Sequence, residues 1–285
     1  MLHWKSIYHA VYQDEKPSAL TIGLPIFSIV FYFAIQYILS EESFEWVVDD
    51  YYLHFDSLFK FKLNALSMHA LFFSTMFEMI VCLLLITIPL NIYEREHGTV
   101  FTGVFLNLIT TFSSIFTCLI GKLLSKLGVI DLDQNYIPVA GMSGWLFVLL
   151  GFFTVRKKMK NNSRNILIQL HRSSVHIPTV MPSILLLVLY NILQFFIYQK
   201  NSSLLSVYHT VCLGIGYLIS SKETYFAVLV PPSGLIMAIE RVLNKLINLI
   251  PLFVQYYKEK DMKRTFLNAE DAEVDELAEL PTYQN

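Results

Sequence analysis

The sequence predicts an all-α polytopic membrane protein with six transmembrane helices, and three observations support this prediction. Of the 285 residues, 54% are hydrophobic and only 15% are charged, whereas a soluble domain carries about a quarter charged residues. The mean hydropathy is +0.50. Six apolar runs reach or approach the roughly 20 residues that a helix needs to cross a bilayer. The net charge of −2 gives no reason to expect a nucleic-acid partner.

Charged connections between the apolar runs predict their orientation. The six runs cover residues 18–40, 65–90, 99–121, 138–155, 178–198 and 204–221. The loop after the fourth run is basic, with Arg156, Lys157, Lys158, Lys160 and Arg164, whereas the loop after the first run is acidic. Because basic loops remain in the cytosol, the fourth run ends on the cytosolic side and the acidic loop faces the lumen. Both termini are then expected in the cytosol.

The segments outside the six-span domain, residues 18–221, have distinct compositions. Residues 1–17 form a short cytosolic segment that lacks the apolar core of a signal peptide. Residues 222–265 contain "LIMAIERVLNKLINLI", whose apolar side chains recur at helical spacing opposite Arg241 and Lys245. This pattern predicts a helix lying at the cytosolic membrane surface, in contact with membrane lipid. Residues 266–285 form an acidic disordered tail, either simply solvated or docking a cytosolic partner.

Two reactive side chains lie at matched positions inside the predicted spans. Ser143 is about five residues past the luminal start of the fourth run, and His209 is about five residues past that of the sixth. At a rise of roughly 1.5 Å per residue, both should lie about 7–8 Å below the same surface. Glycines accompany both side chains and would let the two helices approach closely; they are Gly141, Gly144, Gly214 and Gly216.

A serine and a histidine at equal depth have two interpretations. In the first, His209 removes the proton that makes the hydroxyl of Ser143 a weak nucleophile, and the site opens to luminal water. In the second, Ser143 is a packing residue and His209 a hydrogen-bond partner or proton relay between helices. The soluble-hydrolase motif G-x-S-x-G is excluded, because residue 145 is tryptophan.

The residues around this pair resemble those of a known family, the rhomboid intramembrane serine proteases. The segment "GMSGW" resembles the family's G-x-S-G signature, and "HTVCLGIG" resembles its H-x-x-G-x-x-x-G helix, with Gly216 at the second glycine. The runs "PLNIYEREHGTVFTGVFLNL" and "LIPLFVQYYKEKDMKRT" are similar to a fungal Golgi branch of the family. The resemblance covers roughly residues 15 to 265. It implies Ser143 as nucleophile, His209 as general base and acid, and a Golgi membrane location.

The second run departs from the family pattern. Family members carry H-x-x-x-N there to bind the oxyanion, and an ungapped alignment places Glu78 and Cys82 at these positions. A carboxylate would repel a developing oxyanion unless it were protonated, and losing one oxyanion donor typically slows catalysis by about 10²–10³. His69, nine residues earlier, is not expected to take over the role. The resemblance also suggests that Glu94 and Gly98 hold the turn between the second and third runs.

The sequence therefore predicts a serine endopeptidase that cleaves transmembrane proteins near the luminal face, without a metal or organic cofactor. The alternative is a rhomboid-like pseudoprotease that binds transmembrane clients for degradation or trafficking, and the substitutions at Glu78 and Cys82 favour it. Retention of both Ser143 and His209 favours the protease. A small-solute transporter is poorly supported, since no internal repeat with matched broken helices is present.

Overall fold

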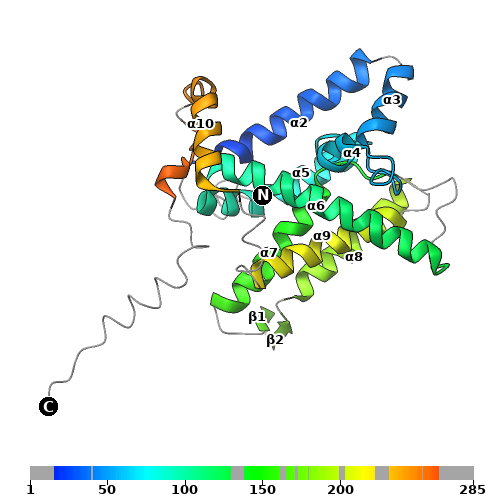
Figure 1. Cartoon of the computed structure of the whole chain (residues 1–285). Coiled ribbons are helices and arrows are strands. Elements are labelled where there is room, and N and C mark those ends of the chain that lie inside the picture. Colours follow the sequence, from blue (N-terminus) through cyan, green and yellow to red (C-terminus); the bar gives the residue numbers. More distant parts are fainter. Residues whose placement is uncertain are drawn as a thin grey trace, which may run out of the picture.

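The computed structural model describes residues 16–39, 41–129, 138–160, 165–170, 173–178, 180–198, 203–221, 231–251 and 253–262, and it is mainly helical (Figure 1). Five described helices are long and apolar enough to cross a membrane: α2 (Ala19–Ile38), α5 (Met76–His97), α6 (Thr99–Lys126), α8 (Met181–Tyr198) and α9 (Ser203–Ser221). These helices confirm the prediction of a polytopic membrane protein. The acidic tail 266–285 lies outside the described residues.

The fourth predicted span is the exception in length. It forms α7 (Ser143–Lys160), whose apolar part, Ser143–Arg156, is shorter than the other five helices. An apolar helix this short is typical of a buried core segment, and α7 is buried along nearly all of this part. Its fully buried side chains include Leu146, Phe147, Val148, Leu149 and Phe152. The other helices therefore enclose α7, so most of its surface is covered by protein.

The helices α7 and α9 pack backbone against backbone. A Cβ atom at Gly216 of α9 would overlap the carbonyl group of Val148 in α7, and one at Gly151 of α7 would overlap the carbonyl oxygen of Leu213 in α9. Small residues that permit such close approach are the usual means of helix association in lipid, where burying apolar side chains offers little advantage over leaving them in contact with acyl chains. These glycines thus set the distance between the two helices that carry Ser143 and His209.

The second span begins later than the sequence pattern suggests, at Met76 instead of residue 65, and it continues to His97. The apolar residues before it form the short helix α4 (Leu63–Met68) and a 3-10 turn, η1 (His69–Leu71). The chain then becomes extended at Phe72, and the Thr75 hydroxyl caps α5 by accepting a hydrogen bond from the Glu78 amide. Hydropathy cannot reveal this break, because the residues on both sides of it are apolar.

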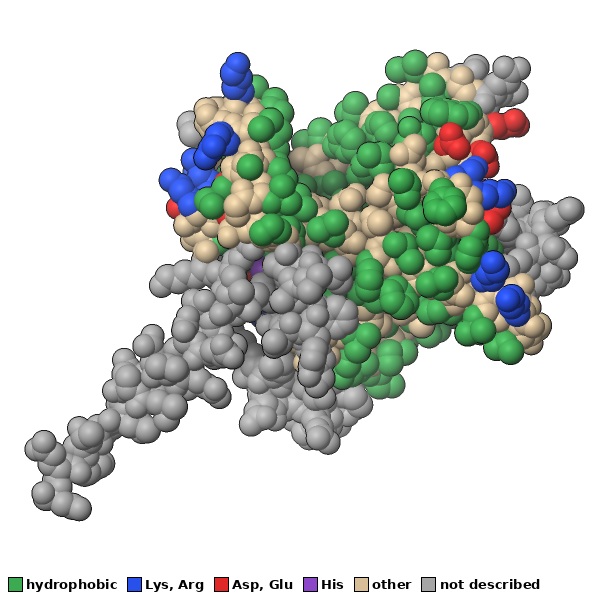
Figure 2. Space-filling view, viewed as in Figure 1, with side chains coloured by type: hydrophobic (Ala, Val, Ile, Leu, Met, Phe, Trp, Pro, Cys, Tyr) green, Lys and Arg blue, Asp and Glu red, His purple; other side chains and the backbone are tan. Residues whose placement is uncertain are grey.

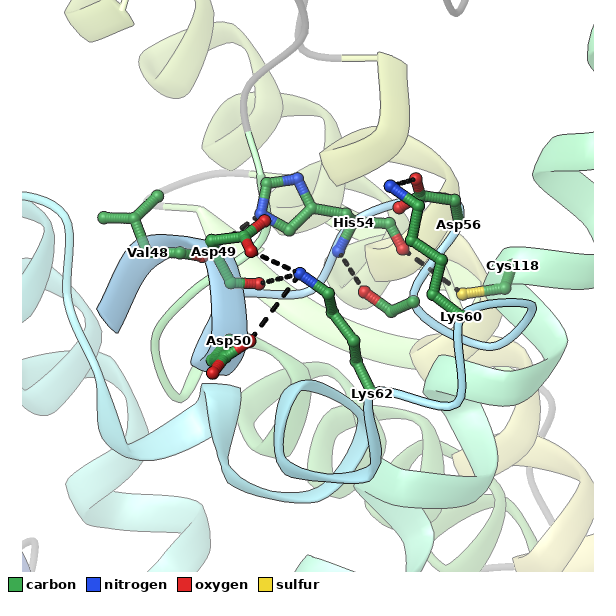
Figure 3. Close-up of polar contacts among 9 residues, drawn as sticks. Val48, Asp49, Asp50, His54, Asp56, Lys60, Lys62 and Cys118 are labelled. Atoms are coloured by element: carbon green, nitrogen blue, oxygen red, sulfur yellow. Dashed lines mark hydrogen bonds and ion pairs between the residues drawn. The ribbon is translucent and has the colours of Figure 1, made fainter. Parts of the chain in front are cut away.

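The loop between α2 and α5 also contains α3 (Glu41–Tyr51), which an ionic contact ties to the residues before α4. Figure 3 shows Lys62 reaching toward Asp49 and Asp50, with its Nζ at 2.6 and 3.7 Å from their carboxylate oxygens. The hydrogen bond from Lys62 lowers the pKa of Asp49. Nearby, the backbone carbonyl of His54 accepts a hydrogen bond from the Cys118 thiol of α6. The first contact joins two parts of this loop, and the second fixes the loop to α6.

At the opposite end of the bundle, Glu94 of α5 caps the start of α2. Its buried carboxylate accepts hydrogen bonds from the backbone amides of Leu20 and Thr21, at 2.8 and 2.9 Å, and from the hydroxyl of Thr99. A carboxylate at a helix N-terminus also interacts favourably with the helix dipole. Gly98, with φ of +96°, forms the turn between α5 and α6. Gly98 therefore lies in this turn, whereas Glu94 lies in the last turn of α5, contacts the start of α6 through Thr99 and also joins α2 to α5.

The end of the described chain returns to this same region. After α10 (Ser233–Ile247), the segment around Gln255 pairs with the residues before α2, and the Tyr257 carbonyl accepts a hydrogen bond from the Thr99 amide at 3.0 Å. A 3-10 turn, η3 (Glu259–Asp261), follows. The residues after the last span therefore join the starts of α2 and α6.

One feature departs from the all-helical prediction. The strands β1 (Asn165–Leu170) and β2 (Ser173–Pro178) pair antiparallel, with Ile166 opposite Ile177. They lie between α7 and α8, where the sequence suggested only a basic loop. The segment is rich in isoleucine, leucine and valine, and two such apolar runs joined by a short connection form a hairpin more readily than an irregular loop.

The packing of α7 on α9 gives a direct test with a control on the same helix. The substitution Gly216→Ala should lower the free energy of unfolding by about 1–3 kcal/mol, because the added methyl group overlaps the backbone of α7. Gly214→Ala is the control, since nothing lies within 4 Å of a Cβ there. Unfolding in detergent, followed by circular dichroism, measures both. Equal stability of the two variants would contradict the close approach.

Candidate active site

Ser143 is held at the first position of α7 by an extended segment. Val139 pairs with Leu53 through two backbone hydrogen bonds of 2.9 Å, and the Gly141 amide donates to the carbonyl of His69 at 3.0 Å. Gly141 has φ of +87°, a conformation that residues with a Cβ atom rarely adopt. The chain turns at this glycine and enters the helix two residues later. Ser143 consequently lies at the helix N-terminus, not about five residues inside a span as the apolar run suggests.

His209 lies in the second turn of α9 and faces this serine. Its Nε2 atom is 2.9 Å from the Ser143 hydroxyl oxygen, and both side chains are at most 1% exposed. This distance is within hydrogen-bonding range. The predicted proximity of the two residues is therefore present in the structure. The residue that follows the serine also permits this approach, because a Cβ atom at Gly144 would overlap the hydroxyl of Tyr208.

A third residue contacts the other nitrogen of the imidazole. The Oδ1 atom of Asn191, on α8, lies 3.0 Å from His209 Nδ1 and also accepts a hydrogen bond from Ser206 at 3.3 Å. The Asn191 amide nitrogen donates to the carbonyl of Leu187 at 2.9 Å. Because these contacts fix Oδ1 as an acceptor, the proton of neutral His209 lies on Nδ1. The lone pair of Nε2 is then directed at the Ser143 hydroxyl.

Aromatic rings fix the plane of this imidazole. The ring of Phe147, one turn after Ser143 on α7, lies 4.7 Å from the His209 ring centroid. The ring of Tyr190, next to Asn191 on α8, contacts it edge to face at 5.2 Å. Three helices thus contribute to the position of one side chain, and the two rings restrict rotation of the imidazole away from Ser143.

Glu78 and Cys82 face the same region from α5. Both are buried, and the Glu78 carboxylate accepts hydrogen bonds from Tyr198 at 2.6 Å and from Gln194 at 3.3 Å, both on α8. A Cβ atom at Gly141 would lie 3.7 Å from a Glu78 carboxylate oxygen. Glu78 therefore lies beside the segment that leads to Ser143, and its two oxygens act as acceptors toward α8.

His69 contacts residues next to both Ser143 and His209, a position that the sequence does not suggest. Its Nδ1 atom donates to the carbonyl of Ala65, so Nε2 accepts a hydrogen bond from the Tyr208 hydroxyl at 2.8 Å. His69 lies in η1, outside the spanning helices, and burial lowers its pKa to about 4. It is therefore neutral at physiological pH. Through its carbonyl and its imidazole, His69 holds the turn before Ser143 and the residue before His209.

Asn191 and His69 are the two contacts that sequence reasoning missed. A signal for Asn191 was present, because an asparagine within the apolar run "LLLVLYNILQFFIY" is costly unless it has a polar partner. The signal does not name the partner, which lies eighteen residues further along the chain. Within the described ranges, no group of three or more His, Cys, Asp or Glu side chains is arranged to hold a metal ion.

Comparison with known proteins places this geometry in context. The family model described as "Rhomboid domain" matches residues 60–223, which include Ser143, His209, Asn191 and Glu78. The chain is 33% identical to rhomboid-type serine protease 2 of Saccharomyces cerevisiae, over 93% of this chain and 90% of that protein. It is 32% identical to the protein of the same name from Eremothecium gossypii, over 93% of this chain and 89% of that protein. A third similar protein of that name, from Kluyveromyces lactis, is 33% identical over 88% of this chain and 83% of that protein.

The contact between His69 and Tyr208 predicts a loss of stability when the hydroxyl is removed. Tyr208→Phe leaves the buried Nε2 atom of His69 without its donor, so the free energy of unfolding should fall by about 1–3 kcal/mol. Tyr217→Phe, at a partly exposed tyrosine of the same helix, serves as the control and should change it little. Combining each substitution with His69→Phe completes a double-mutant cycle. A coupling energy near zero for the His69–Tyr208 pair would contradict the hydrogen bond.

Proposed function

The chain belongs to the rhomboid family, and on this basis we propose that it is an intramembrane serine endopeptidase acting through Ser143 and His209. The observation that carries this proposal is the distance of 2.9 Å between the Ser143 hydroxyl and His209 Nε2 at the N-terminus of a buried helix. A packing serine would not need an imidazole whose proton is fixed on the opposite nitrogen.

In the proposed reaction, His209 Nε2 takes the proton of Ser143 while Oγ bonds to the scissile carbonyl carbon. The tetrahedral intermediate collapses when the carbon–nitrogen bond breaks, and the imidazolium gives its proton to the leaving amine. His209 then removes a proton from water, whose oxygen attacks the acyl-enzyme. When the ester bond breaks, the same proton returns to Ser143, and the second product leaves as a carboxylic acid. Protons balance over the cycle without a cofactor.

We assign stabilisation of the oxyanion mainly to the start of α7. The first amides of a helix have no intrahelical acceptor and carry a partial positive charge, and Ser143 is the first residue of this helix. Its backbone N–H is therefore a donor close to the nucleophile. Glu78 is not assigned as a donor, because its oxygens accept hydrogen bonds from Gln194 and Tyr198. With this donor, the proposed site would not depend on the second-span histidine and asparagine of the family.

Asn191 completes the proposed site as a positioning residue. By accepting the Nδ1 proton of His209, it keeps the lone pair of Nε2 toward Ser143 and stabilises the imidazolium that forms during acylation. A carboxylate fills this position in many serine hydrolases. An amide oxygen performs the orienting part of that role.

The proposed substrates are single-span membrane proteins with helix-destabilising residues near the luminal face. Such residues allow the substrate to unwind and present an extended peptide bond to Ser143. The basic residues at the end of α7 favour a cytosolic location for that end of the bundle, so the start of α7 would face the lumen. By relationship to the fungal branch, we place the protein in the Golgi membrane with both termini cytosolic.

A second candidate function is a pseudoprotease that binds transmembrane clients. The observation that favours it is the presence of Glu78 and Cys82 where active family members have oxyanion donors. Binding alone would not require the Ser143–His209 hydrogen bond. Chemical reactivity of Ser143 therefore distinguishes the two functions.

A fluorophosphonate probe should label the purified protein at Ser143, since such probes react with serines activated by a base. Labelling should be lost in Ser143→Ala and should slow by about 10²-fold or more in His209→Ala. Ser114→Ala is the control, because Ser114 is equally buried but bonds only within α6, to Thr110. Normal binding of a transmembrane client without any Ser143-dependent labelling would establish the pseudoprotease instead.

The role of Asn191 predicts a selective loss of turnover. Asn191→Leu should lower kcat by up to about 10²-fold with little change in KM, because it affects only the orientation of the base. Asn107→Leu, which removes the hydrogen bond from the Asn107 amide of α6 to the Ser67 carbonyl of α4, is the control for general destabilisation. Cleavage of a fluorogenic transmembrane substrate over a range of pH measures both. If the two variants lose equal activity, or if Asn191→Leu changes KM alone, Asn191 does not position His209.

A further inference from the structure

The helix α10 has a surface that the proposed protease activity does not use. We propose that α10 lies in the membrane interface at the end of the bundle opposite Ser143. One stripe of its side chains would be immersed in the bilayer, and Arg241 and Lys245 would contact anionic lipid headgroups. The partner is the lipid leaflet on the side where α5 joins α6, which by the distribution of basic residues is the cytosolic one.

One face of α10 attaches to the protein. Ile236 is 1% exposed, and Glu240, one turn later, accepts hydrogen bonds from the Tyr256 hydroxyl at 2.9 Å and from the Glu259 amide at 3.0 Å. Tyr257 and Thr99 in turn join this segment to the start of α6. The rotation of α10 about its axis is therefore fixed, so the directions of its other two faces are defined.

The second face of α10 is an apolar stripe. Its members recur at spacings of four and three residues, which at about 100° per residue lie within one narrow sector of a helix; they are Leu235, Ile239, Val242, Leu246 and, just beyond the helix, Leu249. Val242 is 83% exposed and Leu246 is 62% exposed. In water, these side chains would lose the stabilisation that apolar burial provides. The described residues leave the stripe uncovered.

The third face of α10 carries the cations. Arg241 and Lys245 are one turn apart and exposed, and at about 100° per residue they lie roughly 80–120° around the helix from the centre of the apolar stripe, on the other side from Ile236 and Glu240. A helix with an apolar face and a basic face is typical of proteins that lie at a membrane surface, where the apolar side enters the acyl region and the cations remain among headgroups. The carboxylate of Glu240 does not weaken this attraction much, because it is turned toward Tyr256.

The placement of α10 favours a bilayer over a protein partner. Figure 1 shows α10 crosswise at the end of the bundle, beside the start of α2. In Figure 2, the hydrophobic atoms of α10 lie on the side turned toward α2, and the Lys and Arg atoms lie on the opposite side. The lipid-exposed residues of α2 include Ile26 and Val30. The apolar stripe of α10 therefore faces the layer that surrounds the spanning helices.

Spin labelling of the full chain in lipid nanodiscs tests this proposal. Labels attached through Val242→Cys, Leu246→Cys and, as the matched control, Lys245→Cys compare the two faces of one helix. The native Cys82, Cys118 and Cys212 can remain because all three are buried. In nanodiscs containing phosphatidylserine, the two stripe labels should be more accessible to oxygen, which partitions into the bilayer. The Lys245→Cys label should be more accessible to a water-soluble nickel chelate.

The role of the cations is measured with the Leu246→Cys label. Each of the substitutions Arg241→Gln and Lys245→Gln, added to the labelled protein, should reduce the fraction of molecules whose label lies in the bilayer by about fivefold. This reduction should occur only when phosphatidylserine is present. Equal nickel accessibility on both faces would overturn the proposal. Dipolar broadening between stripe labels would overturn it in favour of a second copy of the chain. Immersion that is unaffected by phosphatidylserine and by the glutamine substitutions would exclude anionic lipid as the partner.

Discussion

The close approach of α7 and α9 is the constraint on which the rest of the structure depends. Their backbones touch at Gly151 and Gly216, and this separation brings a serine on one helix within 2.9 Å of a histidine on the other. In lipid, such contact depends on shape, because apolar side chains gain little by leaving the acyl chains. The enclosure of α7 by other helices and the hydrogen bond between Ser143 and His209 both depend on this packing.

Much of this arrangement could be predicted from the sequence, because the relevant signals are local. Five spanning helices follow from hydropathy alone, and the pairing of Ser143 with His209 follows from matched depth and neighbouring glycines. The beginnings of α5 and α7 could not be located in this way. Each depends on a break inside an apolar run, at Thr75 and at Gly141, where a side-chain cap or a backbone turn interrupts the helix and hydropathy remains unchanged.

The contacts between distant elements could not be predicted from the sequence either. The partner of Asn191 depends on how α8 rotates about its axis, which is set by the packing of Tyr190 and Phe147 around His209. His69 is not expected at the site because it lies nine residues before Glu78, on a different helical turn, yet the fold places it in a 3-10 turn beside Tyr208. In both cases the residue type suggested a buried polar contact, whereas its partner depended on tertiary packing that periodicity does not encode.

The pairing of Gln255 with the residues before α2 has a consequence for the order of biosynthesis. This contact joins positions 18 and 255, so it closes the chain only after every spanning helix has been made. Until then, the polar contacts of this segment are with α5, through residues such as Glu94, Asn91 and Arg95. Helix α2 therefore acquires its full set of contacts late, and completion of the bundle is coupled to synthesis of the segment beyond α10.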